Sequence, residues 1–202
     1  MDTAVAVFRD GPVEGEVVVT GVKGGSYVNA VFTKLPAGKH GFHIHRAGDL
    51  RGEGCLGACE HYHKGRPCRH GGPPGSKGGP PGSKGERHTG DLGNIERGST
   101  YSYFLKGVTP FDLLGRSLIV HEDEDDLGRG GFPDSGTTGH SGKRIGCAIL
   151  GRAKPCAKAK AKPCAKATPT ATATAKAKPT AKAKPTATKK LKRAGRMTRK
   201  GT

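Results

Sequence analysis

The sequence lacks several residue types that large helical or membrane proteins need. Among its 202 residues there is no tryptophan, there are two methionines, and aromatic residues make up 5%. Leucine is scarce while glycine, at 34 residues, is abundant, which argues against a helix bundle. No stretch approaches the roughly 18 apolar residues of a membrane span, and the start Met1-Asp2-Thr3 lacks a basic region followed by an apolar run. We therefore expect a protein that is neither embedded in a membrane nor exported.

Acidic residues are missing from the last quarter of the chain. The formal net charge is +18, but residues 1–151 carry 18 basic and 17 acidic side chains and are close to neutral. Residues 152–202 carry 17 basic side chains and no acid, and their only large apolar side chains are Leu191 and Met197. Such a segment cannot bury enough apolar surface to offset the entropy lost on folding. The sequence predicts one folded domain over 1–151 and a disordered basic tail of low complexity over 152–202.

Short runs rich in Val, Ile, Phe and Tyr recur in the predicted domain between Gly, Pro and Asp, as in strands joined by turns. The expected strands are Thr3–Phe8, Glu16–Val22, Tyr27–Leu35, Gly41–His45, Thr100–Leu105, Ser117–His121 and Ile145–Leu150. This pattern favours an all-β sandwich or barrel. Residues 46–99 and 122–144 are predicted to be two long functional loops. In the first, Gly-Gly-Pro-Pro-Gly-Ser-Lys occurs at 71–77 and again at 78–84; we interpret this repeat as a flexible surface bulge.

Histidine is concentrated in the middle of the chain, with seven of the nine residues between His43 and His121. Because side chains alternate on a strand, His43 and His45 project to one side and Ile44 to the other, where we expect the core. The remaining five are His61, His63, His70, His88 and His121, and Asp91 follows His88 by three residues. Imidazole suits copper and zinc, and a mixed imidazole and carboxylate set suits zinc or other divalent ions. The pattern indicates a metal centre.

Several segments together resemble the signature segments of the Cu/Zn superoxide dismutase family, in the family's order. They are Gly41-Phe42-His43-Ile44-His45, His70-Gly71-Gly72-Pro73, Arg87-His88-Thr89-Gly90-Asp91-Leu92-Gly93-Asn94, Val120-His121-Glu122, Asp125-Asp126-Leu127-Gly128-Arg129-Gly130-Gly131 and Gly142-Lys143-Arg144-Ile145-Gly146-Cys147. The resemblance implies a Greek-key β-sandwich or barrel of about eight antiparallel strands. It also implies the conversion of two superoxide radicals into dioxygen and hydrogen peroxide, with copper cycling between Cu(II) and Cu(I) beside a structural zinc.

The resemblance also implies roles for individual residues. The expected copper ligands are His43, His45, His61 and His121, and the expected zinc ligands are His61, His70, His88 and Asp91, with His61 bridging the two metals. Asp125 matches a carboxylate that accepts hydrogen bonds from His70 and from either His43 or His45, which fixes ring orientation. Arg144 matches the arginine beside the copper channel, where a cation raises the local concentration of anionic superoxide. With His61, it is the residue to which we assign a catalytic role.

Some positions depart from the family pattern. His63 stands two residues after His61, so a register in which His63 is the bridge is the alternative. Thr137 occupies the position of a steering lysine in many members, and Lys143 beside Arg144 compensates in part. His40 and His140 are interpreted as ordinary surface or loop residues without a ligand role. The repeat also lengthens the interval from His70 to His88.

Six cysteines are present. Cys55 and Cys147 match the family's disulfide within one subunit. Cys59 and Cys68 fall in the first long loop, and free thiols or an extra local disulfide are favoured over metal ligation. Cys156 and Cys164 lie in the basic tail, where exposed thiols could cross-link chains.

The resemblance implies a homodimer, with Leu114 and Gly115 in its interface. The tail is suited to nucleic acid or another polyanion, because dense mobile positive charge binds phosphate backbones without base readout. The plain alternative is a solubilising tail with no partner. We expect a cytoplasmic protein, and the alternative is a nuclear or particle-associated location conferred by the basic tail. The alternative function is a metal-binding or nucleic-acid-packaging protein on an inactive dismutase scaffold.

Overall fold

A computed structural model describes residues 2–9, 11–65, 69–76 and 87–154, and all structural statements below concern these residues. They form nine strands, one 3₁₀ segment and two single-turn helices. In chain order these are β1 Thr3–Phe8, β2 Glu14–Val22, β3 Gly25–Lys34, β4 Lys39–His45, η1 Glu53–Ala58, β5 Asp91–Glu96, β6 Thr100–Lys106, α1 Pro110–Leu113, β7 Ser117–His121, α2 Ser135–Thr138, β8 Arg144–Ile149 and β9 Gly151–Arg152. The tail beyond 154, Cys68, Cys156, Cys164 and the second copy of the repeat lie outside the described residues.

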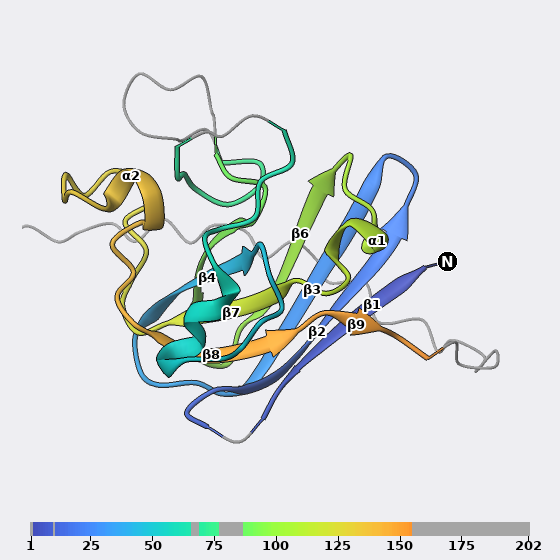
Figure 1. Ribbon diagram of the computed structural model, residues 1–202, viewed down its shortest axis with the longest axis horizontal. Helices are drawn as coiled ribbons and strands as arrows, with labels where there is room; N and C mark the ends of the chain where they lie inside the picture. Colours follow the sequence, from blue (N-terminus) through green and yellow to red (C-terminus); the bar gives the residue numbers. More distant parts are fainter. Residues whose placement is uncertain (1, 10, 66–68, 77–86, 155–202) are drawn as a thin grey trace, which may run out of the picture. The chain divides into compact units, whose positions relative to one another are not determined.

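The strands pair into two antiparallel sheets (Figure 1). One has the order β6-β3-β2-β1-β9 and the other the order β5-β4-β7-β8. Pairing of β4 with β7, and of β3 with β6, joins strands far apart in sequence. The chain crosses between the sheets from β3 to β4, from β5 to β6 and from β6 to β7, whereas the two long loops connect strands of the same sheet, β4 to β5 and β7 to β8. The expected all-β antiparallel fold is confirmed.

The core lies between the sheets and is formed by alternate residues of each strand. In β1 these are Ala4, Ala6 and Phe8, and β2, β3, β4, β6 and β7 contribute in the same alternation. Phe32 of β3 and Phe42 of β4 meet edge to face across the two sheets, with ring centroids 5.5 Å apart. Burial of an aromatic ring such as Phe42 contributes roughly 1.5–3 kcal/mol, and this core fixes the position of β4.

Strand β4 is buried on both faces, and its two faces have different roles. Phe42 and Ile44 belong to the core, whereas His43 and His45 point to the opposite face, where the long loops cover them. The prediction that Ile44 faces the core while His43 and His45 face the other side is confirmed. Irregular register between Gly41 and His43 on β4, and between Val120 and His121 on β7, adds local bulges beside the histidines. Such bulges change the direction in which a side chain projects.

One expectation for the first loop was wrong, and a second was wrong at two glycines, while Gly75 and Ser76 of the same repeat are exposed as expected. The stretch 46–99 ends in β5, which pairs with β4 and buries Leu92 and Ile95. In the first copy of the repeat, Gly71 and Gly72 are buried rather than part of a surface bulge. A buried glycine lets the backbone approach closely, and the Gly71 amide donates to Asp91 Oδ2 at 3.0 Å.

His40 is also placed differently from expectation. It is 3% exposed, because β4 begins at Lys39 and His40 therefore shares the core-facing side with Phe42. Its Nδ1 lies 3.0 Å from the His121 carbonyl and 2.9 Å from the Glu122 carbonyl. Its role is structural, whereas His140 is exposed as expected. Within the described ranges, no helix has the length and apolar character to cross a membrane.

Candidate metal centre

Four histidines converge on the outer face of the β4 sheet. His43 and His45 come from β4, His121 ends the neighbouring strand β7, and His61 reaches the same point from the first long loop. A short bridge between His45 and His61 anchors that loop to the end of β4. One ring nitrogen from each of the four lies within 4.8 Å of the others.

The converging nitrogens have no hydrogen-bond partner. They are His43 Nδ1, His45 Nε2, His61 Nε2 and His121 Nε2, all buried. A buried polar atom without a partner is costly, and native proteins rarely retain one without a reason. Four such nitrogens directed at one point fit a metal that prefers imidazole, such as copper.

The opposite nitrogen of each ring is held by a hydrogen bond. His45 Nδ1 donates to the Cys59 carbonyl at 2.8 Å, and His121 Nδ1 donates to the Gly142 carbonyl at 3.2 Å. These contacts place the proton on Nδ1 and leave the Nε2 lone pair free for a metal. His43 is turned the other way, with Nε2 at 2.9 Å from Asp125 Oδ2.

A second group of ligand atoms surrounds Asp91. Its Oδ1 lies 2.9 Å from His61 Nδ1, 3.0 Å from His70 Nδ1 and 3.3 Å from His88 Nδ1. Its Oδ2 accepts the backbone N–H of His88 at 2.8 Å and that of Gly71. Three imidazoles and one carboxylate are a set that suits tetrahedral zinc. His61 belongs to both groups, through different ring nitrogens.

Asp125 connects the two groups. Its Oδ2 pairs with His43 Nε2, and its Oδ1 lies 2.7 Å from His70 Nε2. The alternative partner His45 is held by Cys59 instead. Asn94 fixes the backbone of Asp125 through two hydrogen bonds, donating to its carbonyl at 2.8 Å and accepting from its N–H at 2.7 Å. Asp125 is therefore a rigid link between a histidine of each group.

Burial sets the protonation of the first group. Burial lowers the pKa of His43 and His45 far below the usual range, and together with the neighbouring His61 it lowers the pKa of His121 to about 3. These imidazoles are neutral near pH 7, which is the form that binds metals. In the second group, burial opposes ionisation of Asp91, but hydrogen bonds from His61, His70 and His88 outweigh it and lower its pKa.

A cavity of about 610 Å³ opens onto the first group. Its wall includes His45, His61, His121, Cys59 and Arg144. The Arg144 guanidinium donates to the carbonyls of Cys55 and Cys59, each at 2.7 Å. Burial lowers the pKa of Arg144, but a guanidinium in a protein stays charged. The cavity therefore presents a fixed cation beside the converging imidazoles.

A disulfide holds this wall in place. Cys55 of η1 and Cys147 of β8 are bonded, with Cα atoms 6.7 Å apart, as expected from the sequence. The bond ties the first long loop to the strand that carries Arg144. Cys59 is a free, exposed thiol.

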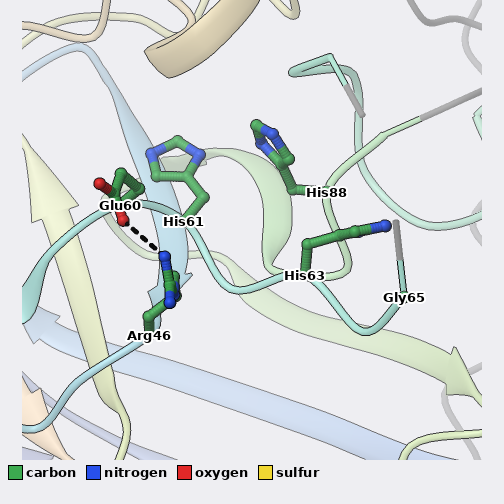
Figure 2. A pocket seen from close by; sticks show the side chains of 6 residues that line it. All are labelled: Arg46, Glu60, His61, His63, Gly65 and His88. Carbon is green, nitrogen blue, oxygen red and sulfur yellow. Dashed lines mark hydrogen bonds and ion pairs between the residues drawn. The ribbon is translucent and has the colours of Figure 1, made fainter. Parts of the chain in front are cut away.

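A second cavity, of about 410 Å³, lies on the side of His88 and is lined by Arg46, Glu60, His61, His63, Gly65 and His88. Figure 2 shows His63 directed toward Gly65, while the His61 and His88 rings lie above it. His63 Nδ1 accepts the Thr89 amide at 3.3 Å. Among the described residues His61, not His63, is shared by the two ligand groups.

Comparison with known proteins agrees with this arrangement. The family model described as copper/zinc superoxide dismutase matches residues 13–150. The chain belongs to the copper/zinc superoxide dismutase family. Over 160 residues it is 41% identical to the superoxide dismutase [Cu-Zn] of Paramecium bursaria Chlorella virus 1, covering 75% of this chain and 79% of that protein.

Two further similarities support this membership. A putative superoxide dismutase [Cu-Zn] of Orgyia pseudotsugata multicapsid polyhedrosis virus is 40% identical over 152 residues, covering 71% of this chain and 87% of that one. The solved structure of the clock protein EA4 superposes with a TM-score of 0.60 at 32% identity, covering 74% of this chain and 93% of that chain. The protein is thus a superoxide dismutase that uses copper and zinc.

Two features of the dismutase site were not anticipated from the sequence. Asn94 was part of a recognised segment, yet its two hydrogen bonds to Asp125 are visible only in the structure. Cys59 adopts φ 62 and ψ −151, a backbone region used almost only by glycine. Its carbonyl accepts hydrogen bonds from both His45 and Arg144, so this strained backbone positions two residues of the site.

Proposed function

We propose that His43, His45, His61 and His121 bind copper, that His61, His70, His88 and Asp91 bind zinc, and that His61 bridges them. This proposal is supported above all by the two ring nitrogens of His61. Its Nε2 faces the unpartnered nitrogens of the other histidines, and its Nδ1 faces Asp91. The reaction oxidises one superoxide to dioxygen and reduces a second, with two protons, to hydrogen peroxide.

The metals and the chain contribute differently to this reaction. Copper supplies a one-electron redox couple, and zinc supplies fixed positive charge without redox chemistry. His61 lines the cavity that holds Arg144, and its Nε2 has no hydrogen-bond partner, so Nε2 can hold and give up a proton for the peroxide product there. His61 Nδ1 stays on the buried side against Asp91, and the ring therefore keeps its place while Nε2 changes protonation.

Arg144 attracts and orients the substrate in this proposal. The carbonyls of Cys55 and Cys59 hold its guanidinium at the cavity wall. Superoxide is a small anion, so a fixed cation raises its local concentration and its association rate. Thr137 lines the same cavity without adding charge.

Matched alanine variants test the ligand roles. His61→Ala should lose both the copper signal and superoxide consumption, because it removes a ligand from each metal. His63→Ala should keep copper and most activity, since His63 belongs to neither group. Metal content by mass spectrometry and the rate of superoxide consumption are measured together. Equal copper and activity in His61→Ala and the parent protein would overturn the assignment. If the parent protein consumes superoxide no faster than free copper does, the alternative of a binding protein on an inactive dismutase scaffold is favoured.

For the tail we propose a separate function. Residues 1–151 would form the catalytic domain, and residues 152–202 would bind nucleic acid or another polyanion. The proposal is supported by 17 basic residues and no acidic residue in that segment. The predicted boundary at 151 falls inside β9, where Arg152 pairs with Ala4. Truncation after residue 154 therefore keeps β9, and it should abolish retention on DNA at low salt and leave superoxide consumption unchanged. Salt-insensitive retention of the full chain would contradict an electrostatic interaction.

We also propose a homodimer formed around Leu114, Gly115 and Ile149. Ile149 is 45% exposed, and it lies beside Gly48 and Gly115, whose backbones approach each other closely, so an apolar side chain is available at this surface. Ile149→Glu should convert a dimer into a monomer, as measured by light scattering. An unchanged mass would exclude this face as the dimer interface.

The cytoplasmic, nuclear or particle-associated location stays a prediction, and fractionation of cells expressing the full and truncated chains would test it.

A further inference from the structure

Two carboxylates lie on the wall of the cavity next to the copper-side histidines, and each is paired with a basic group. Glu60 and Asp134 line this cavity together with Arg144. Glu60 lies 3.1 Å from the Arg46 guanidinium, and Asp134 lies 2.7 Å from Nδ1 of His140. A guanidinium stays charged, whereas an imidazole changes its charge near neutral pH. Of these two pairs, the second is therefore the one whose net charge depends on pH in that range.

The local fold holds His140 against Asp134. Asp134 comes directly before α2, and His140 comes two residues after its end. Thr138 Oγ1 donates to the second oxygen of the carboxylate at 3.3 Å. The Phe132 ring stacks on the imidazole, with centroids 3.8 Å apart and planes at 10°. The side chains of Asp134 and His140 are both 48% exposed, so protons from solvent reach the pair.

The charge of this pair depends on the imidazole. The hydrogen bond from His140 lowers the pKa of Asp134, and the carboxylate is therefore ionised at neutral pH. A protonated imidazole cancels that negative charge. A neutral imidazole can still donate from Nδ1, so loss of its proton keeps the contact and leaves the pair with a net negative charge. A negative charge on the wall that carries Arg144 repels anionic superoxide.

We propose that His140 controls how fast superoxide enters this cavity, because its protonated imidazole cancels the charge of Asp134. The inference rests on the proposed role of Arg144, whose field the Asp134 charge opposes. As the pH rises through the neutral range, kcat/KM for superoxide should fall about two- to threefold at low ionic strength. The fall should shrink at high salt, because the field is screened.

The other ionisable groups on the wall differ from His140 in their chemistry. Three of them, His45, His61 and His121, are copper ligands in the proposed assignment. Carboxylates such as Glu60 ordinarily titrate well below neutral pH. The remaining group is the Cys59 thiol, and a thiol ordinarily titrates at higher pH than an imidazole. A Cys59→Ser variant therefore separates the thiol from the imidazole.

The experiment measures kcat/KM for superoxide from about pH 6 to about pH 8.5, at low and at high ionic strength. It uses the full chain loaded with copper and zinc, and its variants His140→Asn, Asp134→Asn and Cys59→Ser. Asparagine suits position 140 because His140 has φ 49, a left-handed conformation that asparagine adopts more readily than most residues. NMR of the reduced protein follows protonation of the His140 ring, and metal analysis gives the copper content of each variant.

In the parent protein and in Cys59→Ser, kcat/KM should fall over the pH range in which the His140 ring loses its proton. His140→Asn should stay at the parent's high-pH value, and Asp134→Asn should stay at or above the parent's low-pH value, with equal copper content. A fall that persists in Asp134→Asn would overturn the proposal, because His140 would then act without that charge. A fall of equal size at high salt would also overturn it.

Arg144→Ala separates this proposal from the proposed role of Arg144. If Arg144→Ala keeps the parent's kcat/KM, the role of Arg144 fails, and the pH profiles of the parent and Asp134→Asn still decide the role of His140. If Arg144→Ala loses activity while the parent shows no fall as His140 titrates, the role of His140 alone fails.

Discussion

Asp125 Oδ2 lies 2.9 Å from His43 Nε2, while the second oxygen of the same carboxylate lies 2.7 Å from His70 Nε2. One buried side chain thereby orients a histidine of the proposed copper site and a histidine of the proposed zinc site. Because Asn94 fixes the backbone of Asp125, only rotation of the side chain lets the carboxylate follow either ring. The two sites are coupled through this carboxylate as well as through His61.

Replacement of Asp125 by alanine should therefore weaken both metals. Loss of a carboxylate that orients a metal-binding imidazole commonly lowers metal affinity roughly 10- to 100-fold. We expect copper and zinc affinities of Asp125→Ala to fall together, as measured by competition with chelators. Glu124→Gln is the matched control, because it removes one negative charge from the adjacent, exposed position. A loss confined to one metal would contradict the coupling.

Much of this site could be predicted from the sequence. The alternation His43-Ile44-His45 needs only the geometry of a strand, and the structure places Ile44 in the core as that geometry requires. The sequence did not show whether His43 or His45 is the copper-side hydrogen-bond partner of Asp125. The choice depends on the Cys59 carbonyl, which occupies His45 Nδ1 and lies in a loop whose path has no simple sequence signal.

The errors have related causes. Gly93 and Asn94 interrupt the apolar pattern of β5, and pairing with β4 forms the strand in spite of its composition. His40 was expected at the surface or in a loop, outside the predicted strand Gly41–His45. The strand begins two residues earlier, at Lys39, and therefore includes His40, which is buried. Tertiary pairing decides both cases, and neither is a local property of the chain.

Removal of the Cys55–Cys147 disulfide should lower stability and disturb Arg144. The bond closes a loop of 92 residues, and loss of a native disulfide typically costs about 2–5 kcal/mol. Cys55 also supplies a carbonyl that holds Arg144. In Cys55→Ser with Cys147→Ser, urea unfolding should occur at lower denaturant, and kcat/KM should fall. The parent protein with this bond reduced should match the double variant, and Cys59→Ser should keep the parent's stability.

Asp112 should stabilise the fold in a pH-dependent manner. Hydrogen bonds from the Thr109 backbone, and then from the Lys64 side chain, lower the pKa of Asp112 from 3.8 to about 2. Since the folded pKa is the lower one, the ionised carboxylate stabilises the fold. This contribution is complete above about pH 5 and is lost as the pH falls from about 4 through about 2.

Asp112→Asn should thus lower the free energy of unfolding by about 1 kcal/mol at neutral pH, since Asp112 also completes the capping box of α1. The difference between variant and parent should vanish toward pH 2, as measured by urea unfolding across that range. Lys64 belongs to the first long loop and bonds to Asp112 at 3.0 Å. Lys64→Met should consequently give a smaller loss at neutral pH. A pH-independent difference would show that the charge of Asp112 does not contribute.

Thr137 offers a way to test electrostatic attraction by adding charge. It lines the same cavity as Arg144, so Thr137→Lys adds a cation where superoxide enters. We expect kcat/KM to rise several-fold at low ionic strength and the gain to disappear at high salt. Thr137→Gln is the neutral control for side-chain size. Arg144→Ala should show the opposite effect, a roughly tenfold lower kcat/KM with unchanged copper content. A gain in Thr137→Lys that persists at high salt would mean that the lysine acts by contact with the site and not through its field.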